Sequence, residues 1–180
     1  ENGTGLGYSL VVEGNKIITR CSYSDGGGGQ LDLKMAKGDP DSLAKLSAEE
    51  LGRLTNYFEK IKFAGTNINL ISIQADEITL TDITIYHDGV RTNDEIRLDI
   101  EAAMDDFLVN LSFDGVFYIE SFRDRLQQVK NVVDIYVIEL KRVSYFTGSP
   151  VETTITRKVS LDSGYAKIAS FTPIKVEIES

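Results

Sequence analysis

The chain has 180 residues, of which 42% are hydrophobic and 26% are charged, a balance typical of a globular protein. Its 19 basic and 28 acidic residues give a net charge of −9, which argues against nucleic acid or an anionic membrane as the main ligand, because both need a basic surface. Since no run of about 18 apolar residues occurs, we expect no membrane span.

The first residues, ENGTGLGYSL, lack the basic and apolar regions of a signal peptide. The sequence also starts without Met, which is compatible with a fragment or a processed product. Cys21 is the single cysteine and His87 the single histidine, so the sequence predicts neither a disulfide framework nor a thiolate metal cluster.

Residues 1–45 are predicted to be a β-rich N-terminal segment with a glycine-rich loop. Residues 5–20 favour two short strands around Gly14-Asn15, a dipeptide suited to a tight turn. Residues 24–42 contain four consecutive glycines and are predicted to be a flexible loop or linker. This loop is a candidate boundary between parts that move separately.

Residues 46–145 are predicted to form a central α+β module that opens with a helix. Ser47 is the expected N-cap, and Glu50 three residues later completes a capping box. The buried stripe expected at helical spacing consists of Leu51, Leu54, Phe58 and Ile61. Gly65 marks the point where the chain should reverse.

The next segments predict strands and a long helix. Residues 66–87 alternate and are rich in Ile and Thr, which predicts two strands separated by a kink at 75–77. The helix expected from about Asn93 to Asn110 has one apolar stripe, formed by Ile96, Ile100, Ala103, Met104, Phe107, Leu108 and Leu111.

After a turn at 112–115 we expect a short strand, Val116 to Tyr118, and a second helix. Ser121 with Asp124 is its predicted cap, and its apolar positions are Phe122, Leu126 and Val129. Residues 132–146 predict a long strand that is apolar on both faces, at Tyr136, Val137, Ile138 and Leu140, and therefore buried on both sides.

The predicted fold class is α+β, with helices packed on a mixed or antiparallel sheet in a split β-α-β-like central module. Residues 146–180 are predicted to add C-terminal β segments, so that extra strands lie at both ends of the module.

Candidate sites for chemistry are few. The glycines at 26–29 lack the Lys and hydroxyl of a phosphate-binding loop, so we interpret them as a linker. Asp39 and Asp41 resemble the start of a calcium loop with Glu50 at its twelfth position, but Ala44 replaces the sixth-position glycine, which favours solvated acids.

Two further features have an ordinary structural interpretation. His87 precedes Asp88, but strand neighbours point to opposite faces, so we expect a surface or edge histidine instead of a catalytic pair. The acids of the helix at 94–106 are expected to be a solvated face, with a docking face for a basic partner as the alternative. We therefore predict no catalytic, cofactor-binding or metal-binding residues and no enzymatic activity.

Two stretches carry a family resemblance: residues 58–89 and residues 96–140, which include Leu111-Ser112-Phe113-Asp114-Gly115 and Val133-Asp134. They resemble the C-terminal half of baseplate J-like proteins, wedge components of contractile phage tails and related injection machines. Members have a Leu-x-Phe-x-Gly turn, a short strand, a Leu-rich helix and Gly-Val-x-Asp before a strand. The family glycine is Asn131 here, and Asn tolerates the left-handed region.

The turn at 163–165, Ser-Gly-Tyr, is similar to C-terminal segments of phage or prophage proteins of Bacteroidetes bacteria. The resemblance implies a structural subunit, or a fragment of one, of a phage or prophage tail baseplate. Its implied partners are other baseplate subunits in a homo- or hetero-oligomer, and its implied location is the virion tail, with the bacterial cytoplasm during assembly.

Aromatic residues are the candidate interface anchors, because they dominate binding hot spots; core packing is the alternative for each. They are Tyr23, Tyr57, Tyr118, Tyr136, Tyr145 and Phe146. Two other functions stay open. One is a carbohydrate or cell-surface binding module with calcium held by Asp39 and Asp41, and the other is an enzyme of nucleotide or sugar chemistry with acids converging in a pocket.

Overall fold

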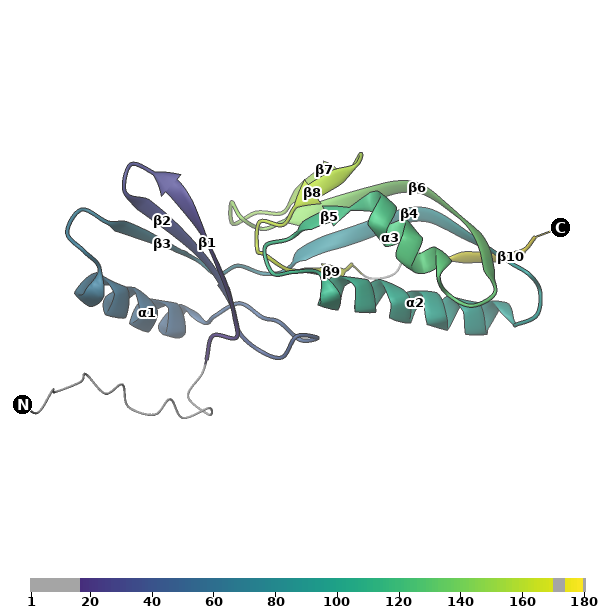
Figure 1. Ribbon diagram of the computed structural model, residues 1–180, viewed down its shortest axis with the longest axis horizontal. Helices are drawn as coiled ribbons and strands as arrows, with labels where there is room; N and C mark the ends of the chain where they lie inside the picture. Colours follow the sequence, from purple (N-terminus) through teal and green to yellow (C-terminus); the bar gives the residue numbers. More distant parts are fainter. Residues whose placement is uncertain (1–16, 170–173, 180) are drawn as a thin grey trace, which may run out of the picture.

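The protein is an α+β protein, seen in a computed structural model that describes residues 17–169 and 174–179 (Figure 1). The expected strands around Gly14-Asn15 lie mostly outside the described residues. The elements are β1 (Arg20–Gly27), β2 (Gln30–Ala36), α1 (Ala48–Ile61), β3 (Asn67–Ile71), β4 (Asp76–His87), α2 (Asn93–Asn110), β5 (Val116–Tyr118), α3 (Ile119–Gln127), β6 (Val132–Ser144), β7 (Val151–Thr154), β8 (Lys158–Ser160), β9 (Ala166–Ile168) and β10 (Lys175–Ile178).

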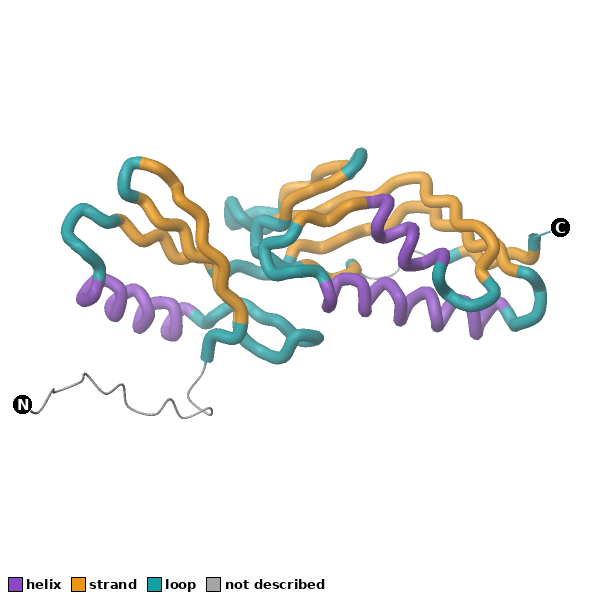
Figure 2. The backbone as a smooth tube through the Cα atoms, in the orientation of Figure 1, coloured by secondary structure: helices purple, strands orange, loops and turns teal. Residues whose placement is uncertain are grey.

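These elements form two units that lie side by side along the long axis of the molecule (Figure 1). The N-terminal unit, from residue 17 to β3, has a sheet of order β1-β2-β3. The C-terminal unit, from β4 onward, has a sheet of order β10-β4-β6-β7, with β9 also paired to β4, and a small sheet of β5 and β8. In each unit the long helix, α1 or α2, lies along one side of the strands (Figure 2).

In the N-terminal unit, β1 and β2 are antiparallel, whereas β2 and β3 are parallel and are joined through α1. The β2-α1-β3 connection is a βαβ unit, in which the crossover helix covers the sheet. Hydrogen bonds between β2 and β3 therefore join residues on both sides of the boundary expected at 45/46.

The prediction of a flexible glycine-rich loop over 24–42 was wrong, because most of this segment is a β-hairpin. Gly27, Gly28 and Gly29 have φ values of 78°, 60° and 83°, so the turn needs residues that adopt the left-handed region freely. The Gly29 carbonyl also accepts a hydrogen bond from the Asn67 amide at 2.8 Å, which ties the hairpin tip to β3.

Helix α1 begins as predicted. The Glu50 amide donates to Ser47 Oγ at 3.2 Å, and the Ser47 amide donates to Glu50 Oε2 at 2.6 Å. Leu54 and Phe58 are partly buried against the core that Leu33 and Met35 form. Ile61 was expected to be buried but is exposed, because it lies in the last turn of the helix.

The core of the C-terminal unit lies between its sheet and the helices α2 and α3. The predicted α2 stripe is confirmed, since Ile96, Ile100, Ala103, Met104 and Leu108 are buried. Phe107 packs edge-on against the rings of Phe117 and Phe122, at centroid distances of 5.7 and 5.4 Å.

Helix α3 starts two residues before its predicted cap. Its N-cap is Tyr118, and no side-chain capping bond is present among the described residues. The Ile119 amide donates instead to the Arg157 carbonyl at 3.0 Å, so backbone from the loop before β8 takes the role expected of Ser121 and Asp124. Phe122 and Leu126 are buried as predicted.

Strand β6 is not buried on both faces along its length, as the sequence had suggested. Ile135 is buried, and Val137 packs against the same core, but Tyr136 between them is 58% exposed. Side chains alternate along a strand, so Tyr136 points to the opposite face. Before β6, Asn131 has φ 71°, the left-handed conformation for which Asn is suited.

Candidate functional site

The strongest polar cluster lies where β4 begins, beside the turn at 163–165. Asp76 is only 1% exposed, and its Oδ2 accepts hydrogen bonds from the Ser163 amide at 2.8 Å and the Ser163 hydroxyl at 2.6 Å. Arg142 Nε lies 3.8 Å from Asp76 Oδ1, and Arg142 Nη2 lies 3.2 Å from Asp162 Oδ2. Burial raises the pKa of the Asp76 carboxyl above its usual value, while the bonds from Ser163 and the charge of Arg142 oppose this shift.

The same turn packs against the Leu-x-Phe-x-Gly segment. The Asp114 amide donates to the Gly164 carbonyl at 2.7 Å, and the Phe113 ring stacks on Tyr165 at a centroid distance of 6.3 Å. Gly164 has φ 89°, and a Cβ there would lie 2.9 Å from the Phe113 ring. Only glycine fits this position without displacing the ring.

Asp114 also joins the two units. Its Oδ1 receives a charged hydrogen bond from Lys34 Nζ of β2 at 2.5 Å, and its Oδ2 accepts from Ser22 Oγ of β1 at 3.2 Å. Lys34 Nζ donates in addition to the Leu161 carbonyl at 3.0 Å. The Leu-x-Phe-x-Gly turn therefore lies at the joint between the two units.

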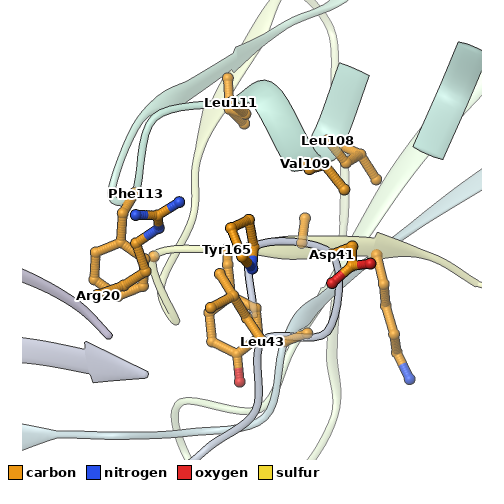
Figure 3. Close-up of a pocket in the computed structure, with 13 residues that line it drawn as sticks. Arg20, Asp41, Leu43, Leu108, Val109, Leu111, Phe113 and Tyr165 are labelled. Atoms are coloured by element: carbon orange, nitrogen blue, oxygen red, sulfur yellow. The ribbon is translucent and has the colours of Figure 1, made fainter. Parts of the chain in front are cut away.

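A cavity of about 180 Å³ lies at this joint, with Arg20, Asp41 and Leu43 from the N-terminal unit and side chains of the C-terminal unit around it (Figure 3). Sites for organic ligands usually enclose about 300–1,000 Å³. The cavity is smaller, and its C-terminal side is largely apolar, with Leu108, Val109, Leu111 and Phe113. We interpret it as an imperfectly filled contact between the units.

His87 is not a surface or edge residue, as had been expected, but is fully buried. Its Nε2 lies 2.8 Å from Asn93 Oδ1, and its Nδ1 accepts from the Gly89 amide at 3.3 Å. Asn93 Nδ2 donates in turn to the Val176 carbonyl of β10 at 3.0 Å. The imidazole therefore joins the end of β4 to the start of α2, and both its nitrogens have protein partners.

The aromatic residues predicted as interface anchors fall on separate elements of both units. Tyr23, Tyr57, Tyr118, Tyr136 and Phe146 are exposed. Tyr145 is half-buried, and its hydroxyl donates to Glu77 Oε2 at 3.1 Å. This hydrogen bond raises the pKa of the Tyr145 hydroxyl.

Tyr136 lies on the face of the large sheet that points away from the core. Its cross-strand partner is Thr84, and the next pair on that face is Tyr86 with Asp134; Glu177 of β10 pairs with Tyr86. Lys175 of β10 pairs with Thr84, and its Nζ forms an ion pair with Glu177. We call these six residues the open sheet face. Cross-strand partners share a face, so two tyrosines lie there beside Asp134 and the Lys175–Glu177 ion pair.

The loop acids Asp39 and Asp41 are exposed. Over residues 17–169 and 174–179, no group of three or more His, Cys, Asp or Glu side chains is arranged to hold a metal ion. No helix in the described part of the chain is long and apolar enough to cross a membrane.

Sequence reasoning missed Lys34, Arg142 and the roles of Asp76 and Ser163, because their partners are far away in the chain. An available signal was the Ser-Gly-Tyr turn at 163–165, which the sequence analysis used for a resemblance and not as a partner for Asp76. No family model matches this chain, and a search of curated proteins found no relative.

Proposed function

We propose that the protein is a structural subunit of a phage or prophage tail baseplate and acts through protein–protein contacts, without catalysis. Its place is then the virion tail, and the bacterial cytoplasm during assembly. The observation that carries the proposal is Tyr136, which is 58% exposed near the middle of a strand of the large sheet. Aromatic side chains held on a rigid sheet make strong anchors because they lose little conformational entropy on binding.

The surroundings of Tyr136 indicate what a partner surface would look like. Asp134 gives the open sheet face an acidic group beside the aromatic rings, whereas Glu177 is ion-paired with Lys175, and the whole chain has a net charge of −9. A matching partner has an apolar recess for the tyrosine and a Lys or Arg placed to meet Asp134. Complementary charge of this kind guides association and disfavours wrong partners.

The joint between the units supports the same function. Lys34 and Ser22 of the N-terminal sheet bind Asp114 in the turn at 112–115 of the C-terminal unit, so the units form a connected block with surfaces on both ends. A block of this kind suits a wedge component, which must hold neighbouring subunits at a fixed separation.

The test is co-expression of the tagged chain with the tail proteins from the same operon, followed by affinity capture and identification of each captured subunit. We expect a stable complex with a baseplate component and a large loss of capture in Tyr136→Ala. The matched control is Leu98→Ala, because Leu98 is an equally exposed apolar residue on α2. A monodisperse chain that captures none of these tail proteins would overturn the proposal.

A further inference from the structure

A hollow of about 740 Å³ lies in the C-terminal unit, between α3, the strands β4 and β6 and the end of β7. We call it the α3 hollow. Its volume is within the range of about 300–1,000 Å³ that is typical of sites for organic ligands, whereas the cavity at the joint is smaller. The side chains that line the hollow all belong to the described part of the chain, so its chemistry can be compared with that of a ligand.

The floor of the α3 hollow is apolar. Ile119 of α3 and Val137 of β6 pack against the core but are only partly buried, and both line the hollow. Leu140 and Ile155 are buried and line it too. A ligand with an apolar body is favoured here, because covering these side chains removes hydrocarbon surface from water.

Arg123 of α3 gives the hollow a positive charge that is poorly paired. Its ion pair with Glu120 Oε1 is 3.8 Å long, its Nη2 donates to the Ile135 carbonyl at 3.4 Å, and its Nε is buried without a hydrogen-bond partner. Arg91 and Arg125, by comparison, have carboxylate oxygens at 2.5 and 2.8 Å. The Arg123 side chain is only 36% exposed, and each Nη nitrogen has two hydrogens, so donors stay free for a ligand in a partly desolvated place.

The other polar groups of the hollow need a ligand less. Glu139 accepts from the Thr154 hydroxyl at 3.4 Å and lies 3.5 Å from Lys141 Nζ, so its charge is balanced within the protein. Thr81, its cross-strand partner, and Thr156 add neutral hydroxyls. The hollow therefore lacks an anion and not a cation.

We propose that the α3 hollow binds a small organic carboxylate. The carboxylate oxygens accept hydrogen bonds from the Nη groups of Arg123, and the apolar chain of the ligand covers Ile119 and Val137. The planar guanidinium matches a carboxylate in shape and charge, and hydrogen bonds between two charged groups are stronger than those between neutral ones.

This site goes beyond the baseplate proposal and does not depend on it. Val137 and Tyr136 are neighbours on β6, and strand neighbours point to opposite faces. A ligand in the α3 hollow therefore leaves the open sheet face accessible. Loss of ligand binding and loss of subunit capture are separate readouts, so one proposal can fail while the other stands.

The first test uses butyrate, hexanoate and octanoate as probes, titrated into the full chain and followed by ligand-detected NMR. We expect the affinity to increase about tenfold for each two added carbons, because each buried methylene group contributes a similar increment. Hexan-1-ol, which has the same chain without a charge, should bind at least about tenfold more weakly than hexanoate. Affinity that is independent of chain length, or equal binding of hexan-1-ol, would overturn the proposal.

The second test removes the charge of Arg123. Arg123→Gln should weaken hexanoate binding at least about tenfold and should remove the preference for hexanoate over hexan-1-ol. Arg97→Gln is the matched control, because Arg97 is also a helical arginine paired with an acid three positions before it, and it lies on α2 away from the hollow. Equal hexanoate affinity in Arg123→Gln and wild type would contradict the assignment.

A measurement on the wild-type chain keeps the proposal testable even where Arg123→Gln does not fold. Hexanoate should shift the methyl resonances of Ile119, Val137 and Ile155 in a saturable way. The methyl resonances of Ile61, which is exposed at the end of α1, should stay unchanged. Shifts centred outside the hollow, or no saturable shift at millimolar hexanoate, would show that the hollow is not a carboxylate site.

Discussion

The hydroxyl of Ser163 lies 2.6 Å from Asp76 Oδ2, although the two residues are 87 positions apart in the chain. The Asp76 amide donates back to Ser163 Oγ at 3.1 Å, and the Ser163 amide donates to the same carboxylate oxygen at 2.8 Å. These contacts attach the turn at 163–165 to the first residue of β4. They hold the Leu-x-Phe-x-Gly segment in place indirectly, because that segment packs on the turn.

Ser163→Ala should destabilise the protein by about 1–3 kcal/mol, because the buried Asp76 carboxylate loses a hydrogen-bond donor and gains none. Urea denaturation followed by circular dichroism measures the change. Ser149→Ala is the control, since Ser149 is exposed, and we expect it to stay within about 0.5 kcal/mol of wild type. A Ser163→Ala midpoint equal to that of wild type would mean that the Asp76 contacts contribute nothing net.

The pH dependence of stability should show the raised pKa of Asp76. A carboxyl whose pKa is higher in the folded state binds its proton more tightly there, so its contribution to stability increases as the pH falls through the folded-state pKa toward its ordinary value of 3.8. Asp76→Asn lacks this titration. We therefore expect wild type to gain stability relative to Asp76→Asn as the pH falls through the raised folded-state pKa toward 3.8. A difference that is constant with pH, or that changes in the opposite sense, would contradict the assignment.

Two glycine substitutions should have opposite signs. Gly164→Ala should cost about 1–3 kcal/mol, because Gly164 has φ 89° and the new Cβ would meet the Phe113 ring at 2.9 Å. Gly52→Ala should stabilise the protein by about 0.5–1 kcal/mol, since Gly52 is inside α1 and a Cβ there would meet nothing within 4 Å. Thermal unfolding of both variants tests the pair, and a stabilising Gly164→Ala would refute the packing described for this turn.

The helix caps give a further prediction. Ser47→Ala and Thr92→Ala each remove a capping box and should each cost about 1 kcal/mol. Ser42→Ala is the control, because Ser42 lies in the exposed loop before α1. Chemical denaturation of the three variants measures the effect. If Ser47→Ala lowers the free energy of unfolding no more than Ser42→Ala does, the cap of α1 does not contribute to stability.

The parts of the fold that were predicted correctly depend on neighbouring residues. The start of α1 is predictable from Ser47 and Glu50, which are three residues apart. The buried face of α2 is predictable from the helical spacing between Ile96 and Leu108. The glycine run was misinterpreted because consecutive glycines suit both a linker and a tight hairpin turn. The alternation of residues 30–36 favours a hairpin strand over a linker. That strand is stabilised by its pairing with β3, which follows only after α1 in the chain.

The candidate site was less predictable because it depends on pairs that are distant in sequence. Lys34 and Asp114 are 80 positions apart, and nothing local to either residue indicates the other. The burial of His87 likewise depends on Asn93 and on a strand near the end of the chain. Exposed positions such as Tyr136 could be proposed as anchors from residue type, but only the sheet decides which face they occupy.

The parallel pairing of β10 with β4 has a consequence for biosynthesis. The N-terminal unit is contiguous in the chain and can fold while translation continues, since α1 and its three strands emerge from the ribosome before β4. The larger sheet cannot be completed until late, because β4 is translated long before β10, the strand that pairs with its edge. A nascent chain paused between these two strands would present an unfinished sheet, which is the stage most exposed to chaperones and to aggregation.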